Sequence, residues 1–223
     1  MIGGLAAILV VVVGVGTILV GVGIGIVIYK RRQKRIRAFH AFAAQSQFSV
    51  VAEPKLDSFE DLSQYPIFRR GHSGTIRTLI QKPIDGGQLF IFDYVYTVRS
   101  GRSAKNHTTT VIAFHCPRLQ LPYFTLYPES VLSIIGELVG WKDIDFVSHP
   151  TFSRRYKLSG EQEMHIRQVF SQHVLTSFES MPEVSVDGGG KYIFVYTPKQ
   201  IIEIESLNRC IDNAISIYGL FRP

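Results

Sequence analysis

The sequence has few cysteines and none of the short motifs that mark metal or nucleophile sites. Only two of its 223 residues are cysteine, too few for a disulfide scaffold. No Cys-x-x-Cys, His-x-x-x-His or His-Glu-x-x-His spacing occurs, so we expect neither a bound metal nor a cofactor. Glycine and proline, at 19 and 10 residues, are close to average, which excludes collagen-like and low-complexity chains.

Charged side chains are missing from one long stretch at the N-terminus, residues 2–29. From Leu5 to Tyr29 the chain has 25 residues, of which 16 are Leu, Ile or Val. An α-helix of that length spans about 37 Å, more than the roughly 30 Å hydrocarbon core of a bilayer. The sequence therefore predicts a transmembrane helix over residues 1–29. A cleaved signal peptide is disfavoured because no Lys or Arg precedes the apolar run.

Basic residues follow the apolar run directly, and the positive-inside rule then places the C-terminal side in the cytoplasm. The basic cluster consists of Lys30, Arg31, Arg32, Lys34, Arg35 and Arg37. We expect a single-pass protein of the bacterial inner (plasma) membrane, N-terminus outside, with a basic juxtamembrane helix over residues 30–46. These side chains either contact anionic lipid headgroups or act only as a topology signal. The other 18 basic residues balance 18 acidic ones, so nucleic-acid binding is not expected.

Gly14, Gly21 and Gly25 share one face of the predicted helix. Small residues let helices approach closely, so this face could pair two copies into a homodimer or join a larger membrane complex. The alternative is that glycine is simply common in transmembrane helices.

The remainder of the chain predicts a connector at residues 47–70 and an α+β globular domain at residues 71–223, with a possible subdomain break near residue 146. Strands precede most of the helices, which favours a mostly antiparallel sheet with three amphipathic helices. Strands are expected at 75–82, 89–98, 108–116, 123–127, 154–158, 184–186 and 191–196. A polar hairpin loop is expected at residues 99–107, and the first helix is expected from Pro128 to Gly140. Two capping boxes, Ser159–Gln162 and Thr197–Gln200, are expected to begin the second and third helices.

Asp93 is the most notable carboxylate, because its strand neighbours on the same face are Leu89, Ile91 and Val95. A buried acid needs hydrogen-bonding or charged partners, such as Arg77, or else a raised pKa. It is either a structural acid or a functional one. Asp187-Gly-Gly-Gly-Lys191 lacks the spacing of a phosphate-binding loop and predicts a hairpin turn instead.

Several short motifs resemble those of an uncharacterised family of bacterial single-pass membrane proteins with a cytosolic α+β domain. They are Phe-Asp-Tyr-Val-Tyr at 92–96, Leu-Pro-Tyr-Phe at 121–124, Asp-Ile-Asp-Phe at 143–146 and His-Pro-x-Phe-Ser at 149–153. The resemblance covers about residues 60–220 and implies no assigned activity.

The sequence thus favours a membrane-anchored, non-catalytic interaction or scaffold domain that contacts the bilayer and a cytosolic or membrane protein. The alternative from another class is a membrane-tethered hydrolase that uses Asp93 with His72 or His115. The two hypotheses differ in geometry, because a hydrolase needs these groups within about 4 Å of one another in an open cleft.

Overall fold

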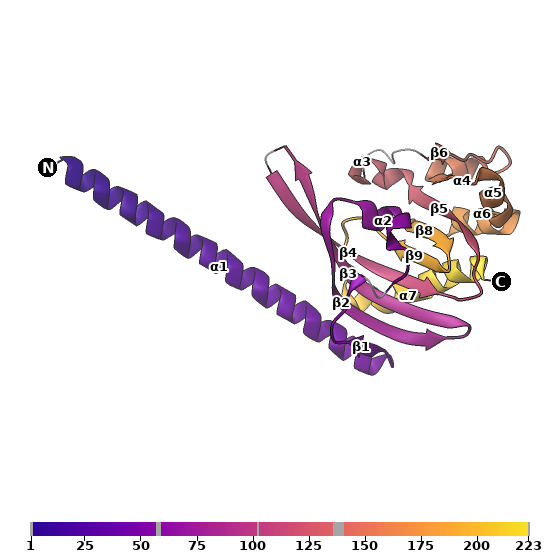
Figure 1. Ribbon diagram of the computed structural model, residues 1–223, viewed down its shortest axis with the longest axis horizontal. Coiled ribbons are helices and arrows are strands. Elements are labelled where there is room, and N and C mark those ends of the chain that lie inside the picture. The colour runs from indigo at the N-terminus through magenta and orange to yellow at the C-terminus, as the bar shows by residue number, and fades with distance from the viewer. Residues whose placement is uncertain (1, 57–58, 102, 136–140, 223) are drawn as a thin grey trace. The chain divides into compact units, whose positions relative to one another are not determined.

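The computed structural model describes residues 2–56, 59–101, 103–135 and 141–222 (Figure 1). The chain divides into two compact units, Met1–Phe42 and Ala43–Pro223, and each is described by itself.

The N-terminal unit is made of helix α1 (Ile2–Gln45), which runs without interruption through the basic cluster. Its side chains are described from Leu19 onward. Within the described residues, no helix is both long enough and apolar enough to span a membrane. The predicted transmembrane helix, and the single-pass fold class that included it, are therefore wrong.

The second unit is built on one sheet, which has nine strands in the described part of the chain and only antiparallel neighbours. The strand order is β1-β2-β3-β4-β9-β8-β5-β7-β6. The strands are β1 (Ser49–Val51), β2 (His72–Ile84), β3 (Gly87–Ser100), β4 (Ser103–His115), β5 (Leu121–Pro128), β6 (Lys142–Asp143), β7 (Tyr156–Gly160), β8 (Ser185–Gly190) and β9 (Tyr192–Tyr196).

Strands β3 and β4 form the longest hairpin of the sheet, and both were predicted from their β-branched and aromatic residues. The polar loop expected at residues 99–107 is wrong, because the strands continue to Ser100 and resume at Ser103, which pair with each other. Residues at the tip of an exposed hairpin do not have to be buried. Polar side chains there are therefore compatible with strands that stay paired up to the turn.

Short helices connect the strands, and one longer helix closes the chain. They are η2 (Leu62–Gln64), α2 (Pro66–Arg69), η3 (Glu129–Val131), α3 (Leu132–Ile135), α4 (Pro150–Arg155), α5 (Glu163–Val169), α6 (Gln172–Ser180) and α7 (Ile204–Phe221). The helix expected from Pro128 to Gly140 begins as η3, and residues 136–140 lie outside the described residues.

Both predicted capping boxes are wrong. Ser159 is a fully buried residue of β7, and α5 begins at Glu163 with Gln162 as its N-cap. The helix predicted to follow is two helices, because the backbone leaves the helical conformation at Phe170. Likewise α7 begins at Ile204 with Glu203 as its N-cap. Thr197 directly follows β9, and its carbonyl accepts the Gln200 N–H in a turn.

One face of the sheet, here called the aromatic face, carries rings from β3 and β9, the two strands that flank β4. It comprises Phe90, Phe92, Tyr94 and Tyr96 of β3 with Tyr192, Phe194 and Tyr196 of β9. Residues 59–70, including η2 and α2, pack over it within the same hydrophobic cluster. The segment predicted as a connector therefore covers part of the core.

The opposite face packs against the helices, with α7 lying along the sheet (Figure 1). The Phe114 ring stacks on Tyr218 of α7 with centroids 4.6 Å apart. Phe124 contacts Phe170 edge-on at 4.9 Å and Phe221 at 5.5 Å. Four helices from the second half of the chain thus share one core with the sheet, and β5 is buried from Phe124 onward.

Glycines in β8 make room for these rings. A Cβ atom at Gly188 would overlap the ring of Phe124, which is fully buried and cannot move aside. We expect Gly188→Ala to cost about 1–3 kcal/mol of unfolding free energy, as overpacked cores do. In contrast, a Cβ at Gly219 of α7 would meet nothing within 4 Å, so Gly219→Ala should stabilise the protein by up to about 1 kcal/mol. Urea unfolding of the two variants checks both signs, and equal stabilities would contradict the packing described here.

Candidate functional site

Two acidic side chains are buried in the described part of the sheet, Asp93 and Asp187. Asp187 is 0 % exposed and points into the aromatic face, where it lies opposite Thr125 of β5 and Phe194 of β9. It is the centre of the most extensive buried polar network in the described chain.

The Asp187 carboxylate accepts four hydrogen bonds. Thr125 donates its hydroxyl to Oδ1 at 2.6 Å, and the Tyr127 hydroxyl lies 3.1 Å from the same oxygen. On the other side, Oδ2 accepts the Tyr196 hydroxyl at 3.0 Å and the backbone N–H of Ile67 at 2.9 Å. Strands β5, β8 and β9 are therefore joined at one carboxylate to residues 59–70, here called the covering segment.

A partly buried cation completes this network. The Arg70 guanidinium lies 5.0 Å from the centre of the Tyr127 ring. Burial acts to lower the pKa of Arg70, but Tyr196, Tyr127 and Asp187 raise it by more, so that the side chain stays charged. Burial also raises the pKa of Asp187, while the hydroxyl of Thr125 and the charge of Arg70 act in the opposite direction.

Tyrosine hydroxyls attach the covering segment to the sheet at further points. Tyr65 donates to the backbone carbonyl of Gly189 at 2.6 Å. Its ring meets Phe194 edge-on at a centroid distance of 4.7 Å. Phe68 packs against Tyr94 and Phe194 at 5.0 and 5.1 Å. The aromatic face is consequently closed around Asp187 and leaves the carboxylate no access to solvent.

Asp93 lies on the opposite face of the sheet and is 4 % exposed. Its Oδ1 accepts the hydroxyl of Thr110, the residue paired with it on β4, at 2.7 Å. Thr110 also accepts the backbone N–H of Ile202 at 3.0 Å, just before α7 begins. The acid therefore helps to join the chain entering α7 to the sheet.

The histidines proposed as partners of Asp93 lie far from it. His72 pairs with Thr97, four residues along β3 from Asp93, or about 13 Å away. His115 pairs with Gln88, five residues away in the other direction, and its ring stacks on Tyr192 at 4.7 Å on the aromatic face. The hydrolase arrangement that uses Asp93 with either histidine is not formed.

The predicted lipid-contacting residues all lie on α1. Lys30, Arg31, Arg32, Lys34 and Arg37 are exposed, whereas Arg35 is half-buried and lies 4.5 Å from the Phe39 ring. Cβ atoms at Gly21 and Gly25 would meet nothing within 4 Å, and the side-chain position of Gly14 lies outside the described residues. Across the described chain, no three His, Cys, Asp or Glu side chains converge into a metal site.

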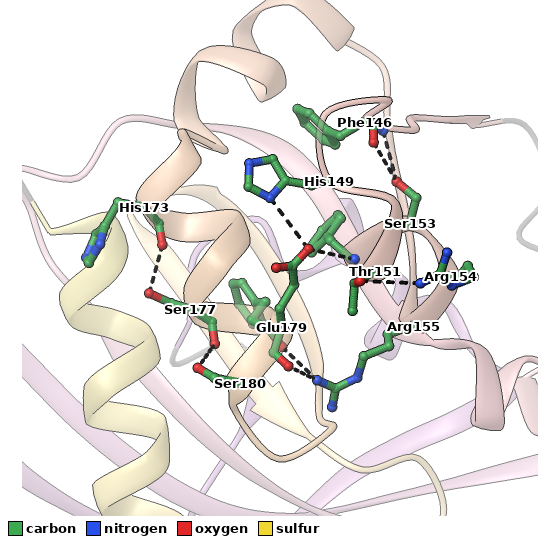
Figure 2. Close-up of polar contacts among 12 residues, drawn as sticks. Phe146, His149, Thr151, Ser153, Arg154, Arg155, His173, Ser177, Glu179 and Ser180 are labelled. Carbon is green, nitrogen blue, oxygen red and sulfur yellow. Dashed lines mark hydrogen bonds and ion pairs between the residues drawn. The ribbon is translucent and has the colours of Figure 1, made fainter.

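A second polar cluster joins α4 to α6 (Figure 2). Glu179 of α6 accepts the backbone N–H of Phe152 at 3.0 Å and lies 3.5 Å from Nδ1 of His149. Arg155 at the end of α4 donates in return to the carbonyl of Met181, at 3.1 Å, and to that of Glu179. Each helix end is capped by a side chain of the other helix, so these polar residues hold the pair together.

The motifs behind the family resemblance also have structural positions. Phe-Asp-Tyr-Val-Tyr lies in β3 and Leu-Pro-Tyr-Phe begins β5. In Asp-Ile-Asp-Phe, the N–H of Ile144 donates to the Leu158 carbonyl at 2.8 Å. The guanidinium of Arg167 lies 5.0 Å from the centre of the Phe146 ring. Most of these residues contribute to packing, whereas Leu121 and Pro122 at the start of β5 are only half-buried.

Asp187 was missed because it precedes three glycines and therefore resembles a turn residue. The hairpin is present, but Gly189 still pairs with Tyr192, so the turn lies at Gly190 and Lys191. Gly190 adopts φ +49° there, a conformation that favours glycine. The only local signal that Asp187 lies in a strand was its alternation with Ser185 and Gly189 on one face. Its partners Thr125 and Tyr127 are about 60 residues away in sequence.

The fold and this network define a class of protein, a single antiparallel sheet whose aromatic face is closed around a buried acid. No family model matches the chain, and no curated protein matches it. Among solved structures it is similar to the crystal structure of the mycobacterial trehalose monomycolate transport factor A, TtfA. The likeness has a TM-score of 0.59 at 14% identity and covers 83% of this chain and 93% of that one. The two proteins therefore share a fold.

Removal of the Asp187 carboxylate should destabilise the second unit strongly. Asp187→Ala removes the acceptor of three hydroxyls and of the Ile67 N–H, together with the negative charge near Arg70, so we expect a loss on the order of 3–5 kcal/mol. Asp187→Asn keeps the shape and should lose about 1–3 kcal/mol, because its NH2 group faces a donor. Chemical unfolding measures both losses.

The matched control is Asp143→Ala, which removes an acid that is 42% exposed and 3.5 Å from Lys157. That change should cost less than about 1 kcal/mol. An Asp187→Ala protein as stable as this control would contradict the central role of the buried carboxylate.

The tyrosines of the aromatic face should make the protein sensitive to alkali. Burial, followed by the charge of Tyr96, raises the pKa of Tyr94 to about 12, and burial raises that of Tyr196 well above its usual value. A raised pKa in the folded state gives stability that is complete below about pH 10 and is lost as the pH rises toward 12.

Absorbance at 295 nm, followed together with circular dichroism, tests this expectation. Some of the ten tyrosines should ionise near pH 10, and a second group only when the protein unfolds. Ionisation of all ten near pH 10 with an unchanged dichroism spectrum would show that the rings are accessible.

Proposed function

We propose that this protein is a non-catalytic accessory factor in the transport of trehalose monomycolate or a related glycolipid. The observation that carries the proposal is the likeness to TtfA over most of both chains. A shared fold at this low identity supports a related role, and the role of the neighbour is stated in its name.

The chemistry of the buried acids supports the non-catalytic part of the proposal. All four hydrogen bonds to Asp187 come from the protein itself, and its carboxylate is closed off from solvent. Asp93 is occupied by Thr110 in the same way. A general acid or base has to reach its substrate directly or through one water, and neither carboxylate is placed to do so.

An accessory factor without a reaction of its own acts through binding. Its targets would be the transported lipid, a partner protein or both. The sheet and its helices form a rigid support, on which exposed polar side chains can be positioned precisely.

Depletion of the protein in the organism that encodes it tests the proposal. Cells are pulse-labelled with radioactive trehalose, and lipids from the cell interior and the cell surface are separated by thin-layer chromatography. We expect the labelled trehalose ester to accumulate inside and to fall several-fold at the surface.

Re-expression of the wild type, or of the stable control Asp143→Ala, should restore the distribution, whereas Asp187→Ala should not. If the label reaches the surface equally well with and without the protein, or if no trehalose ester is formed in that organism, the transport role is wrong.

A further inference from the structure

A groove of about 560 Å³ opens at the end of the sheet, away from the buried network. The chain entering β5 forms its floor, α5 forms one wall, and the turn between β8 and β9 forms the other. This volume lies within the roughly 300–1,000 Å³ usual for small-molecule sites. All of its lining residues belong to the second unit.

Uncharged amides dominate the polar lining of the groove. Gln120 and Gln168 are exposed, and within the described residues neither side chain has a hydrogen-bond partner. Each amide offers two donors and an acceptor. They can therefore bind groups that both donate and accept, as hydroxyls do.

The third amide fixes the orientation of a histidine. Nδ1 of His165 lies 3.0 Å from Oε1 of Gln162, and this oxygen can only accept, so we assign the proton to Nδ1. Nε2 of His165 is then an acceptor, and the NH2 group of Gln162 stays available as a donor. The wall formed by α5 thus presents donors and acceptors side by side.

The groove carries little net charge. Its one ammonium group, on Lys191, lies 3.8 Å from the Glu60 carboxylate, and the lining contains no acid. Leu121, Pro122 and Val169 are half-buried and supply apolar surface between the amides. A phosphate or a peptide carboxylate would find no free cation here, whereas a sugar presents hydroxyls along its edge and C–H groups on its ring face.

We propose that this groove binds a neutral sugar headgroup of disaccharide size, such as trehalose. The inference rests on the proposed function, because it assigns the sugar part of the transported glycolipid to a site. Gln120 and Gln168 bind the hydroxyls, and the apolar floor contacts the sugar rings.

Saturation-transfer NMR on the full chain, with free trehalose as the probe, tests the assignment. Saturation of the protein should reach the ring protons of the sugar, and a titration should give a saturable curve. In the double variant Gln120→Ala/Gln168→Ala the affinity should fall about fivefold or more, because two hydrogen-bonding groups are lost. Both residues are exposed, so the variant should fold, and circular dichroism checks that it does.

The matched control is Gln172→Ala, an exposed amide on α6 outside the groove, which should bind trehalose as the wild type does. Glycerol, which also carries hydroxyls but no ring, should give no saturable signal. The assignment is overturned if trehalose does not bind, or if it binds equally well to the double variant.

These outcomes are separate from those of the depletion experiment. A lipid-transport defect without trehalose binding would remove the groove assignment and leave the accessory role in place. Trehalose binding without a transport defect would leave a sugar site whose purpose lies elsewhere.

Discussion

The Asp187 carboxylate is the interaction on which the arrangement of the second unit depends. It joins β5, β8 and β9 to the segment before β2 through four hydrogen bonds, each from a different residue. Burial of an acid costs free energy, and its raised pKa reflects that cost. The acid is tolerated because a hydrocarbon side chain at this position would leave three hydroxyls and one N–H without an acceptor. The polar network therefore specifies how the covering segment lies on the sheet, a role that nonspecific packing of rings cannot perform.

Rings on both faces of the sheet explain the glycine content of β8. Rings that lie flat on a sheet need neighbours without side chains, and Gly188 and Gly189 provide this space beneath Phe124 and Tyr123. Asp187 precedes them on the same strand, so one short sequence supplies both the central acid and the space for the adjoining rings. A stretch that locally resembles a flexible turn is thus among the most tightly packed parts of the molecule, with Asp187 and Gly188 both buried.

This difference between local pattern and final packing sets the limit of what the sequence could predict. The strands β3 and β4 were predictable because β-branched and aromatic residues mark them without help from distant parts of the chain. Ser159 and Thr197 were assigned to helix starts on a local motif. Ser159 instead pairs with Thr125 in the sheet, and Thr197 begins a turn after β9, with α7 starting later at Ile204. The apolar run at the N-terminus predicted a membrane span, whereas no helix of the described residues is both long enough and apolar enough to be one. The site residues Thr125, Tyr127 and Asp187 come together only through the register of β5 and β8, which no local pattern encodes.

The same reasoning separates the residues that hold the fold from those available for binding. The hydrogen bonds of the Asp187 carboxylate all come from the protein itself, and a ligand could reach this carboxylate only by displacing the covering segment. The amides of Gln120 and Gln168 are different, because they are exposed and have no partner within the described residues. Replacing them should leave stability almost unchanged, whereas replacing Asp187 should not, since surface substitutions are usually within about 0.5 kcal/mol of neutral. A rigid interior with an independent polar groove at its edge is the arrangement expected of a protein that binds a sugar headgroup without changing it chemically. In the proposed sugar site, the exposed amides of Gln120 and Gln168 rather than the buried acid would contact the ligand.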